Sequence, residues 1–285
     1  MRGKTILITG ATNGIGLEAA VALARVGDRI IMVGRDPGRT EAAVAGVIAR
    51  SGSGDVSHLL CDFSSQASIR ALAGEILARL DRLDVLINNA GGVHKARQLT
   101  VDGIEATFAV NHLGYFLLTN LLCGLLVRSA PARVVTVASA AHRQGTLDFE
   151  DLGYERGYRI MRAYSRSKLA NVLFAAELAR RLAGTSVTSN SLHPGTVATN
   201  IWSGAPAWAQ PLIRILVRPF MISPEEGGAT LVQLAAAPEL EGVTGQYFEK
   251  GVAVAPAPLA RDEALAQRLW DVSARLVGLP GETGP

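Results

Sequence analysis

The sequence predicts an α/β fold, a single doubly wound domain built around a mostly parallel seven-stranded sheet. Short apolar runs alternate along the chain with longer segments whose apolar residues recur every three or four positions. The short runs are apolar nearly throughout, as expected for strands buried on both faces by helices. No internal repeat, low-complexity segment or linker divides the 285 residues, so the domain is predicted to span 1–285.

Most of these short runs are rich in Val, Ile or Leu, which is typical of buried strands. The expected strands are 4–9, 29–33, 56–61, 84–88, 133–138, 186–192 and 246–248. The segments between them have helical spacing. The expected helices cover 15–26, 37–50, 65–79, 104–127 and 163–183.

Composition excludes several classes of protein. A hydrophobic content of 48% and a charged content of 19% describe a globular chain with an ample core. The net charge of +3 is spread without like-charged blocks, so no nucleic-acid partner is expected. Cys61 and Cys123 are expected to be free thiols. The N-terminus has no signal-peptide pattern and no apolar stretch is judged long enough to span a membrane, so a cytoplasmic protein is predicted.

One segment interrupts the alternation of strands and helices. Residues 201–222, IWSGAPAWAQPLIRILVRPFMI, are rich in Trp, Leu, Ile and Pro and follow the sixth expected strand. Ligands of open α/β sheets bind at the carboxyl ends of the strands. Residues 199–222 are therefore predicted to form a small apolar lid over a substrate, with a permanently packed helix or a membrane-surface helix as alternatives.

A glycine-rich turn, TGATNGIG (9–16), follows the first strand and opens the first helix. Its glycines allow a tight turn and close approach of the backbone to a ligand, and the helix N-terminus presents free amides to a pyrophosphate. This is the strand–turn–helix context of a Rossmann-type dinucleotide site. The predicted contacts in this turn are Gly10, Thr12, Asn13, Gly14, Ile15 and Gly16.

Three motifs in order resemble the short-chain dehydrogenase/reductase family: the glycine turn, NNAG (88–91) and Tyr164-x-x-x-Lys168. The phrases VASAAH (137–142), YSRSKLANVLF (164–174) and HPGTVATN (193–200) resemble its retinol-dehydrogenase-like branch. The resemblance covers nearly the whole chain. It implies an oxidoreductase that interconverts a carbonyl, expected to be lipophilic, and the corresponding alcohol.

The resemblance assigns the catalytic roles. Tyr164 is the general acid/base, Lys168 lowers its pKa and binds the nicotinamide ribose, and Ser139 hydrogen-bonds the substrate oxygen. A lysine charge about 5 Å from a phenol favours the phenolate by roughly 3 kcal/mol, which is a little over two pKa units. Asn111 is expected to support a water-linked proton path, the alternative being a buried amide satisfied by backbone groups.

The residues after the second strand indicate the cofactor. The position where NAD-selective relatives carry an acid is Gly34, and Arg35 follows it with a guanidinium suited to a 2′-phosphate. Asp36 could instead be the acidic partner of the NAD ribose. NADP(H) is therefore favoured over NAD(H). The remaining cofactor contacts implied by the resemblance are Asp62, Phe63, Asn89, Ala90, Gly91, Pro194, Gly195, Val197 and Thr199.

No metal site is predicted, because His193 has no His, Cys or carboxylate at ligand spacing. The expected partner is a small apolar carbonyl or alcohol, and a homo-oligomer is possible. Two alternatives stay open: a non-catalytic dinucleotide-binding sensor or scaffold, and an epimerase or dehydratase that recycles its nicotinamide. The second is disfavoured because such relatives are usually longer.

Overall fold

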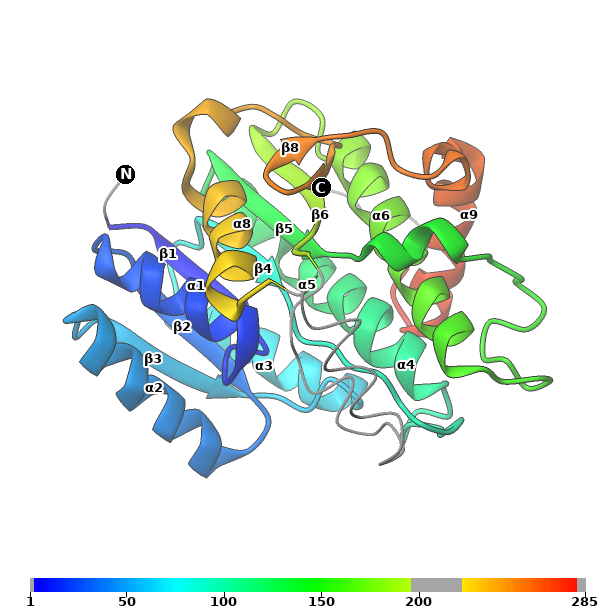
Figure 1. Ribbon diagram of the computed structural model, residues 1–285, viewed down its shortest axis with the longest axis horizontal. Coiled ribbons are helices and arrows are strands. Elements are labelled where there is room, and N and C mark those ends of the chain that lie inside the picture. Colours follow the sequence, from blue (N-terminus) through cyan, green and yellow to red (C-terminus); the bar gives the residue numbers. More distant parts are fainter. Residues whose placement is uncertain (1–2, 196–221, 281–285) are drawn as a thin grey trace.

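The computed structural model describes residues 3–195 and 222–280, and within them one sheet runs through the whole molecule (Figure 1). Its strand order is β3-β2-β1-β4-β5-β6-β7-β8. The seven predicted strands are present: β1 Thr5–Thr9, β2 Arg29–Gly34, β3 Val56–Leu60, β4 Val85–Asn88, β5 Ala132–Val137, β6 Val187–His193 and β7 Tyr247–Glu249. All neighbours among these seven pair in parallel.

The sheet has an eighth strand, so the prediction of seven was wrong. Strand β8, Val252–Ala253, pairs antiparallel with β7. The chain reverses between them at Lys250 and Gly251, whose φ angles are 50° and 76°. With two exposed residues, β8 has too little sequence to show either the length or the alternation by which strands are recognised.

The helices follow the predicted pattern with one interruption. The segment expected as one helix over 104–127 consists of α4 Ala106–Phe108, a π-helical turn η1 Ala109–Leu113, and α5 Gly114–Arg128. The other long helices are α1 Gly14–Arg25, α2 Pro37–Ser51, α3 Gln66–Arg79, α6 Ile160–Arg181, α8 Pro224–Ala236 and α9 Glu263–Leu276. Short 3₁₀ turns are η2 Ala140–Gln144, η6 Pro238–Leu240 and η7 Pro258–Arg261.

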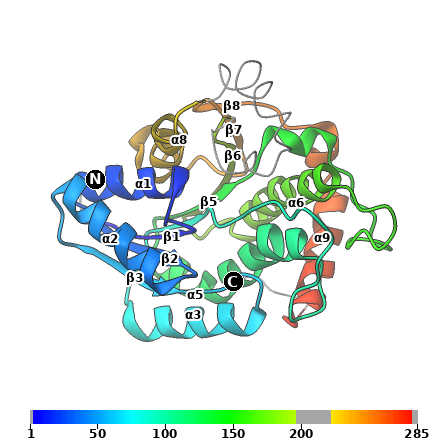
Figure 2. The same cartoon turned by 60° about the horizontal axis from the view of Figure 1, so that its bottom comes forward.

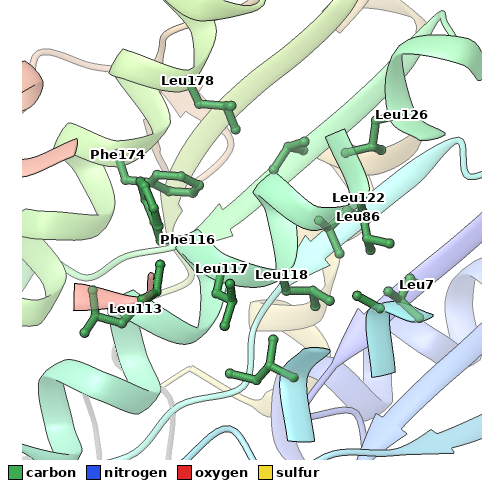
Figure 3. Packing of buried hydrophobic residues seen from close by; sticks show 14 of the residues in the cluster. Leu7, Leu86, Leu113, Phe116, Leu117, Leu118, Leu122, Leu126, Phe174 and Leu178 are labelled. Atoms are coloured by element: carbon green, nitrogen blue, oxygen red, sulfur yellow. The ribbon is translucent and has the colours of Figure 1, made fainter. Parts of the chain in front are cut away.

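Helices cover both faces of the sheet (Figure 2). Alternate residues of β1 point to opposite faces, so Ile6 and Ile8 pack with α1, α2 and α8, while Leu7 packs with α3, α5 and α6. Figure 3 shows the second of these cores, in which Phe116 of α5 lies beside Phe174 of α6 with ring centroids 5.8 Å apart. Helix α9 closes this side, where Trp270 stacks on Phe174 at a centroid distance of 5.9 Å. The predicted doubly wound architecture is confirmed.

One predicted helix is apolar over a length that the sequence analysis did not expect. Residues Ala106–Arg128 form a helix long and apolar enough to cross a membrane by length and composition, so the prediction that no such stretch exists was wrong. In the fold, 67% of its apolar window is buried. Its side chains pack against the sheet, α3 and α6, and a buried core helix passes the same test.

Two further expectations concern the thiols and the lid. Cys61 and Cys123 are both free, as predicted. The predicted lid, 199–222, lies outside the described residues except for its last position.

Candidate active site

The candidate site lies where β1 and β4 end side by side. From β1 the sheet continues through β2 to β3, and from β4 it continues the other way to β5 and β6. Connections on the two sides leave a crevice at such a switch point, outside the carboxyl ends of the strands. The glycine turn, NNAG, Ser139 and His193 each follow or end one of these strands.

The NNAG segment braces the glycine turn. Gly10 has a φ of +65°, and a Cβ there would lie 2.6 Å from the Cα of Ala90. A Cβ on Gly16 would lie 2.5 Å from Asn89 Nδ2. Asn89 Nδ2 donates to the carbonyls of Thr9 and Gly10 at 2.9 and 3.0 Å. Gly10 and Gly16 therefore face NNAG, where a side chain would not fit, and the Asn89 side chain holds the turn in place.

The first turn of α1 follows the glycine turn directly. The helix begins at Gly14, where φ is +56°, and its N-cap Asn13 makes no side-chain capping bond. The first amides of a helix have no intrahelical partners and carry the positive end of its dipole. With no side chain capping them, they suit the pyrophosphate of a dinucleotide.

The end of β2 has no room for a side chain at Gly34. A Cβ there would lie 2.1 Å from Thr40 Oγ1 and 2.7 Å from Thr12 Cγ2. Arg35 is exposed. The carboxylate of Asp36 is the N-cap of α2 and accepts the backbone N–H of Arg39 at 2.8 Å.

The two predicted adenine contacts, Asp62 and Phe63, have different surroundings. Asp62 accepts the backbone N–H and the hydroxyl of Ser64 at 2.9 and 2.8 Å. Phe63 is 7% exposed and belongs to the core with Ile69. Gly114 is a glycine because a Cβ there would lie 2.7 Å from the Phe63 ring. The Phe63 ring therefore supports the site from the core side.

Helix α6 positions the Tyr164 and Lys168 side chains together. The ammonium of Lys168 lies 5.6 Å from the centre of the Tyr164 ring and donates to the carbonyl of Val137 at 3.0 Å. Asn171 donates to the same carbonyl at 3.1 Å. Burial lowers the pKa of Lys168 from 10.5 to about 8. The predicted juxtaposition of phenol and ammonium is present.

The predicted pKa shift of Tyr164 is wrong in sign for the protein alone. Burial raises the pKa of Tyr164 above 10, and hydrogen bonding with Ser139 only opposes that rise. The sequence-based value counted the lysine charge and left out the cost of removing a phenolate from water. Desolvation is the larger effect here.

Ser139 lies between β5 and the turn η2. Its hydroxyl accepts the N–H of Ala141 at 3.2 Å. The Ser139 side chain also hydrogen-bonds to the side chain of Tyr164. Ser139 and Tyr164 are 25 positions apart in sequence, and the segment between them includes a long loop that ends where α6 begins. Ser139 and Tyr164 therefore meet through the fold and not through their distance in sequence.

The Asn111 side chain is fully engaged by its neighbours. Its Nδ2 donates to Gly92 O at 2.9 Å and to Ser167 Oγ at 3.0 Å, and its Oδ1 accepts from Gly92 N at 2.9 Å. Ser167 Oγ in turn donates to the carbonyl of Tyr164 at 2.7 Å. A Cβ on Gly91 would lie 2.9 Å from Asn111 Oδ1. The amide thus ties the π turn η1 to NNAG and to α6, while its part in a water-linked proton path stays a prediction.

The nicotinamide side is described only in part. Pro194 and Gly195 follow β6, and Gly195 has a φ of +99°. Val197 and Thr199 lie outside the described residues. Burial lowers the pKa of His193. Among residues 3–195 and 222–280 no cluster of three or more metal-ligating side chains occurs.

Several polar residues at the site were not predicted. They are His142, Arg166, Ser167 and Asn171, each buried. Ser167 and Asn171 stand in YSRSKLAN beside Lys168, and a buried polar residue on the apolar face of a helix is a usable signal. His142 and Arg166 contact segments that are distant from them in sequence, so the residues around them do not indicate their roles.

The fold and the site together define a nicotinamide-dinucleotide-binding α/β protein of the oxidoreductase class. The family model of the short chain dehydrogenase matches residues 4–210. Retinol dehydrogenase 14 of Mus musculus is 47% identical over 293 residues, which cover 98% of this chain and 87% of that protein. The chain therefore belongs to the short-chain dehydrogenase/reductase family and to its retinol-dehydrogenase-like branch.

Solved structures agree with this assignment. A putative uncharacterized protein from Mycobacterium paratuberculosis is 34% identical with a TM-score of 0.79, over 98% of this chain and 94% of that one. An active-site complex of Pseudomonas aeruginosa RhlG with NADP is 26% identical with a TM-score of 0.71, over 93% and 97%.

Proposed function

We propose that the protein is an NADP(H)-dependent oxidoreductase that interconverts a lipophilic aldehyde or ketone and its alcohol, with Tyr164 as the general acid/base. The observation that carries the proposal is the meeting of Ser139, Tyr164 and Lys168 beside the glycine turn. A sensor or scaffold would need the dinucleotide cradle but not a serine, a tyrosine and a buried lysine in contact. An enzyme therefore explains more of the residues at the site than a sensor or scaffold does.

The cradle fits the cofactor, because the uncapped amides of α1 suit a pyrophosphate and no atom lies within 4 Å of the place of a Cβ on Gly14. When bound, NADPH supplies a hydride to the carbonyl carbon. The Ser139 hydroxyl polarises the carbonyl oxygen, and Tyr164 donates the proton. A phenol whose pKa is raised by burial is protonated at neutral pH, which suits this acid role in the reductive direction. Lys168 restores the proton to Tyr164.

The end of β2 supports NADP(H) over NAD(H). Gly34 has no space for the carboxylate that would accept the ribose 2′-hydroxyl. Asp36, the other acidic candidate, is engaged as the N-cap of α2. Arg35 is left exposed beside them, where its guanidinium can pair with a 2′-phosphate. The NADP complex of the related RhlG is consistent with this preference.

The name of the relative retinol dehydrogenase 14 suggests the first substrates to test. Purified protein would be mixed with NADPH or NADH and with retinaldehyde, long aliphatic aldehydes or short polar aldehydes, following absorbance of the reduced cofactor. We expect turnover of a lipophilic carbonyl with NADPH at a kcat/KM at least about tenfold above that with NADH. Binding of NADPH without turnover of any carbonyl in the panel would favour the sensor.

A further inference from the structure

A buried histidine outside the assigned residues contacts the backbone of Ser139. His142 is 0% exposed and lies in η2, three residues after Ser139. Its Nδ1 lies 2.8 Å from the carbonyl oxygen of Ser139, and its Nε2 lies 3.0 Å from the backbone nitrogen of Ala257. Two segments 115 residues apart in sequence are joined by this one ring.

The two partners determine the tautomer of the ring. A carbonyl only accepts, so Nδ1 carries the proton; the Ala257 N–H only donates, so Nε2 is bare. His142 is therefore neutral, with Nδ1–H toward Ser139. Burial lowers the pKa of His142, in agreement with a neutral ring. A second proton on Nε2 would face the Ala257 N–H.

Neighbouring side chains fix the plane of the imidazole. The Tyr247 ring packs edge-on against it with centroids 4.7 Å apart. The Tyr247 hydroxyl donates to Glu249 at 2.8 Å, and Arg143 donates to the same carboxylate at 3.0 Å. The ring has little freedom to turn within this arrangement.

We propose that His142 is a positioning residue for Ser139: its Nδ1–H holds the Ser139 carbonyl, while Nε2 anchors the turn to the C-terminal segment at Ala257. The same carbonyl also accepts the His142 backbone N–H at 3.0 Å. With its peptide held by two donors, Ser139 keeps its hydroxyl beside Tyr164. The inference rests on the proposed function only for the catalytic consequence, because the tautomer follows from the geometry alone.

Two isosteric variants separate the two bonds of the ring. The amide nitrogen of Asn in His142→Asn takes the place of Nδ1 and keeps the donor to Ser139. The amide oxygen of Gln in His142→Gln takes the place of Nε2 and keeps the acceptor for Ala257. Each variant loses one hydrogen bond, so their melting temperatures should fall to a similar extent.

Steady-state kinetics with NADPH and the best carbonyl substrate would compare these variants with wild type. We expect His142→Gln to lower kcat at least about tenfold with KM for NADPH unchanged, and His142→Asn to stay within about threefold of wild type. Equal kcat values for the two variants, whether high or low, would overturn the positioning role. A merely structural role predicts such equality, since both variants lose one bond.

A second measurement does not depend on activity. Nitrogen-15 NMR of histidine-labelled wild-type protein, assigned by comparison with His142→Asn or His142→Phe, distinguishes neutral Nδ1–H from neutral Nε2–H. We expect the Nδ1–H tautomer; the Nε2–H tautomer or a charged ring at pH 7 would overturn the proposal. If wild type turns over no carbonyl while the Nδ1–H tautomer is found, the proposed function fails and the His142 geometry stands.

Discussion

The ammonium of Lys168 lies 5.6 Å from the centre of the Tyr164 ring, and the only hydrogen-bond partner found for it among the described residues is the carbonyl of Val137. A buried cation with a neutral acceptor keeps much of its desolvation cost, which is why burial lowers the pKa of Lys168 to about 8. The buried lysine thus makes the fold less stable at neutral pH.

Replacement of this lysine should stabilise the protein while inactivating it. A fall in pKa from 10.5 to about 8 corresponds to about 3 kcal/mol. Allowing for the lost bond to Val137, we expect Lys168→Met to raise the free energy of unfolding at pH 7 by roughly 1–3 kcal/mol. Urea denaturation measures this. Lower stability of the variant at pH 7 would contradict it.

The pH dependence follows from the same shift. The folded-state pKa is the lower one, so between about pH 8 and 10.5 the unfolded chain holds a proton that the folded chain lacks. The free energy of unfolding of wild type therefore rises relative to that of Lys168→Met as pH rises through this window. Urea denaturation at pH 7, 8.5 and 10 should show that the stability advantage of Lys168→Met over wild type becomes smaller as pH rises.

Arg35 should determine cofactor preference. A charge-assisted bond to phosphate is worth about 1.5–3 kcal/mol, so Arg35→Ala should weaken NADPH ten- to hundredfold and NADH little. Fluorescence titration with both cofactors measures this. Arg79→Ala, a change at another exposed arginine, is the control. Equal losses for NADPH and NADH would assign the preference elsewhere.

Asp36 should act on stability and not on cofactor choice. Its carboxylate caps α2, so Asp36→Ala should cost about 1 kcal/mol of stability. The ratio of NADPH to NADH affinity should stay within about twofold of wild type, because the carboxylate is engaged by the helix. A selective loss of NADH affinity would show that Asp36 serves the ribose.

Arg166 should anchor the loop between η2 and α6. Its Nε donates to Thr146 O at 3.0 Å, its Nη1 donates to Asp151 O, and its guanidinium lies 3.6 Å from the centre of the Tyr154 ring. We expect Arg166→Met to lower stability by about 2–4 kcal/mol and to expose this loop to proteolysis.

The control for that change lies on the same helix. Arg162 is exposed, so Arg162→Met should shift stability by less than about 0.5 kcal/mol. Similar proteolysis rates of the two variants would contradict the anchoring role of Arg166.

Much of the fold could be predicted because its signals are local. Most of the seven strands are runs of apolar residues, and the observed bounds differ from the predicted ones by one residue at most. The π turn at Asn111 could not be predicted, since it depends on the bonds of that side chain to Gly92 and Ser167.

The sequence predicted that Tyr164 and Lys168 lie together, but not the electrostatics of the pair. The motifs identified Tyr164 and Lys168, while the direction of the Tyr164 pKa shift depends on burial, which spacing does not reveal. The orientation of Phe63 into the core likewise depends on Gly114, which is distant in sequence. The role proposed for His142 depends on contacts with residues distant in sequence, so the neighbouring sequence does not indicate it.

The central claim is that Tyr164 transfers the proton, and Tyr164→Phe tests it most directly. The change removes the hydroxyl and keeps the ring on α6, so NADPH affinity should stay within about threefold of wild type. Turnover of the best carbonyl substrate should fall by at least about a hundredfold. A variant that binds NADPH normally and retains a tenth or more of wild-type kcat would contradict the account.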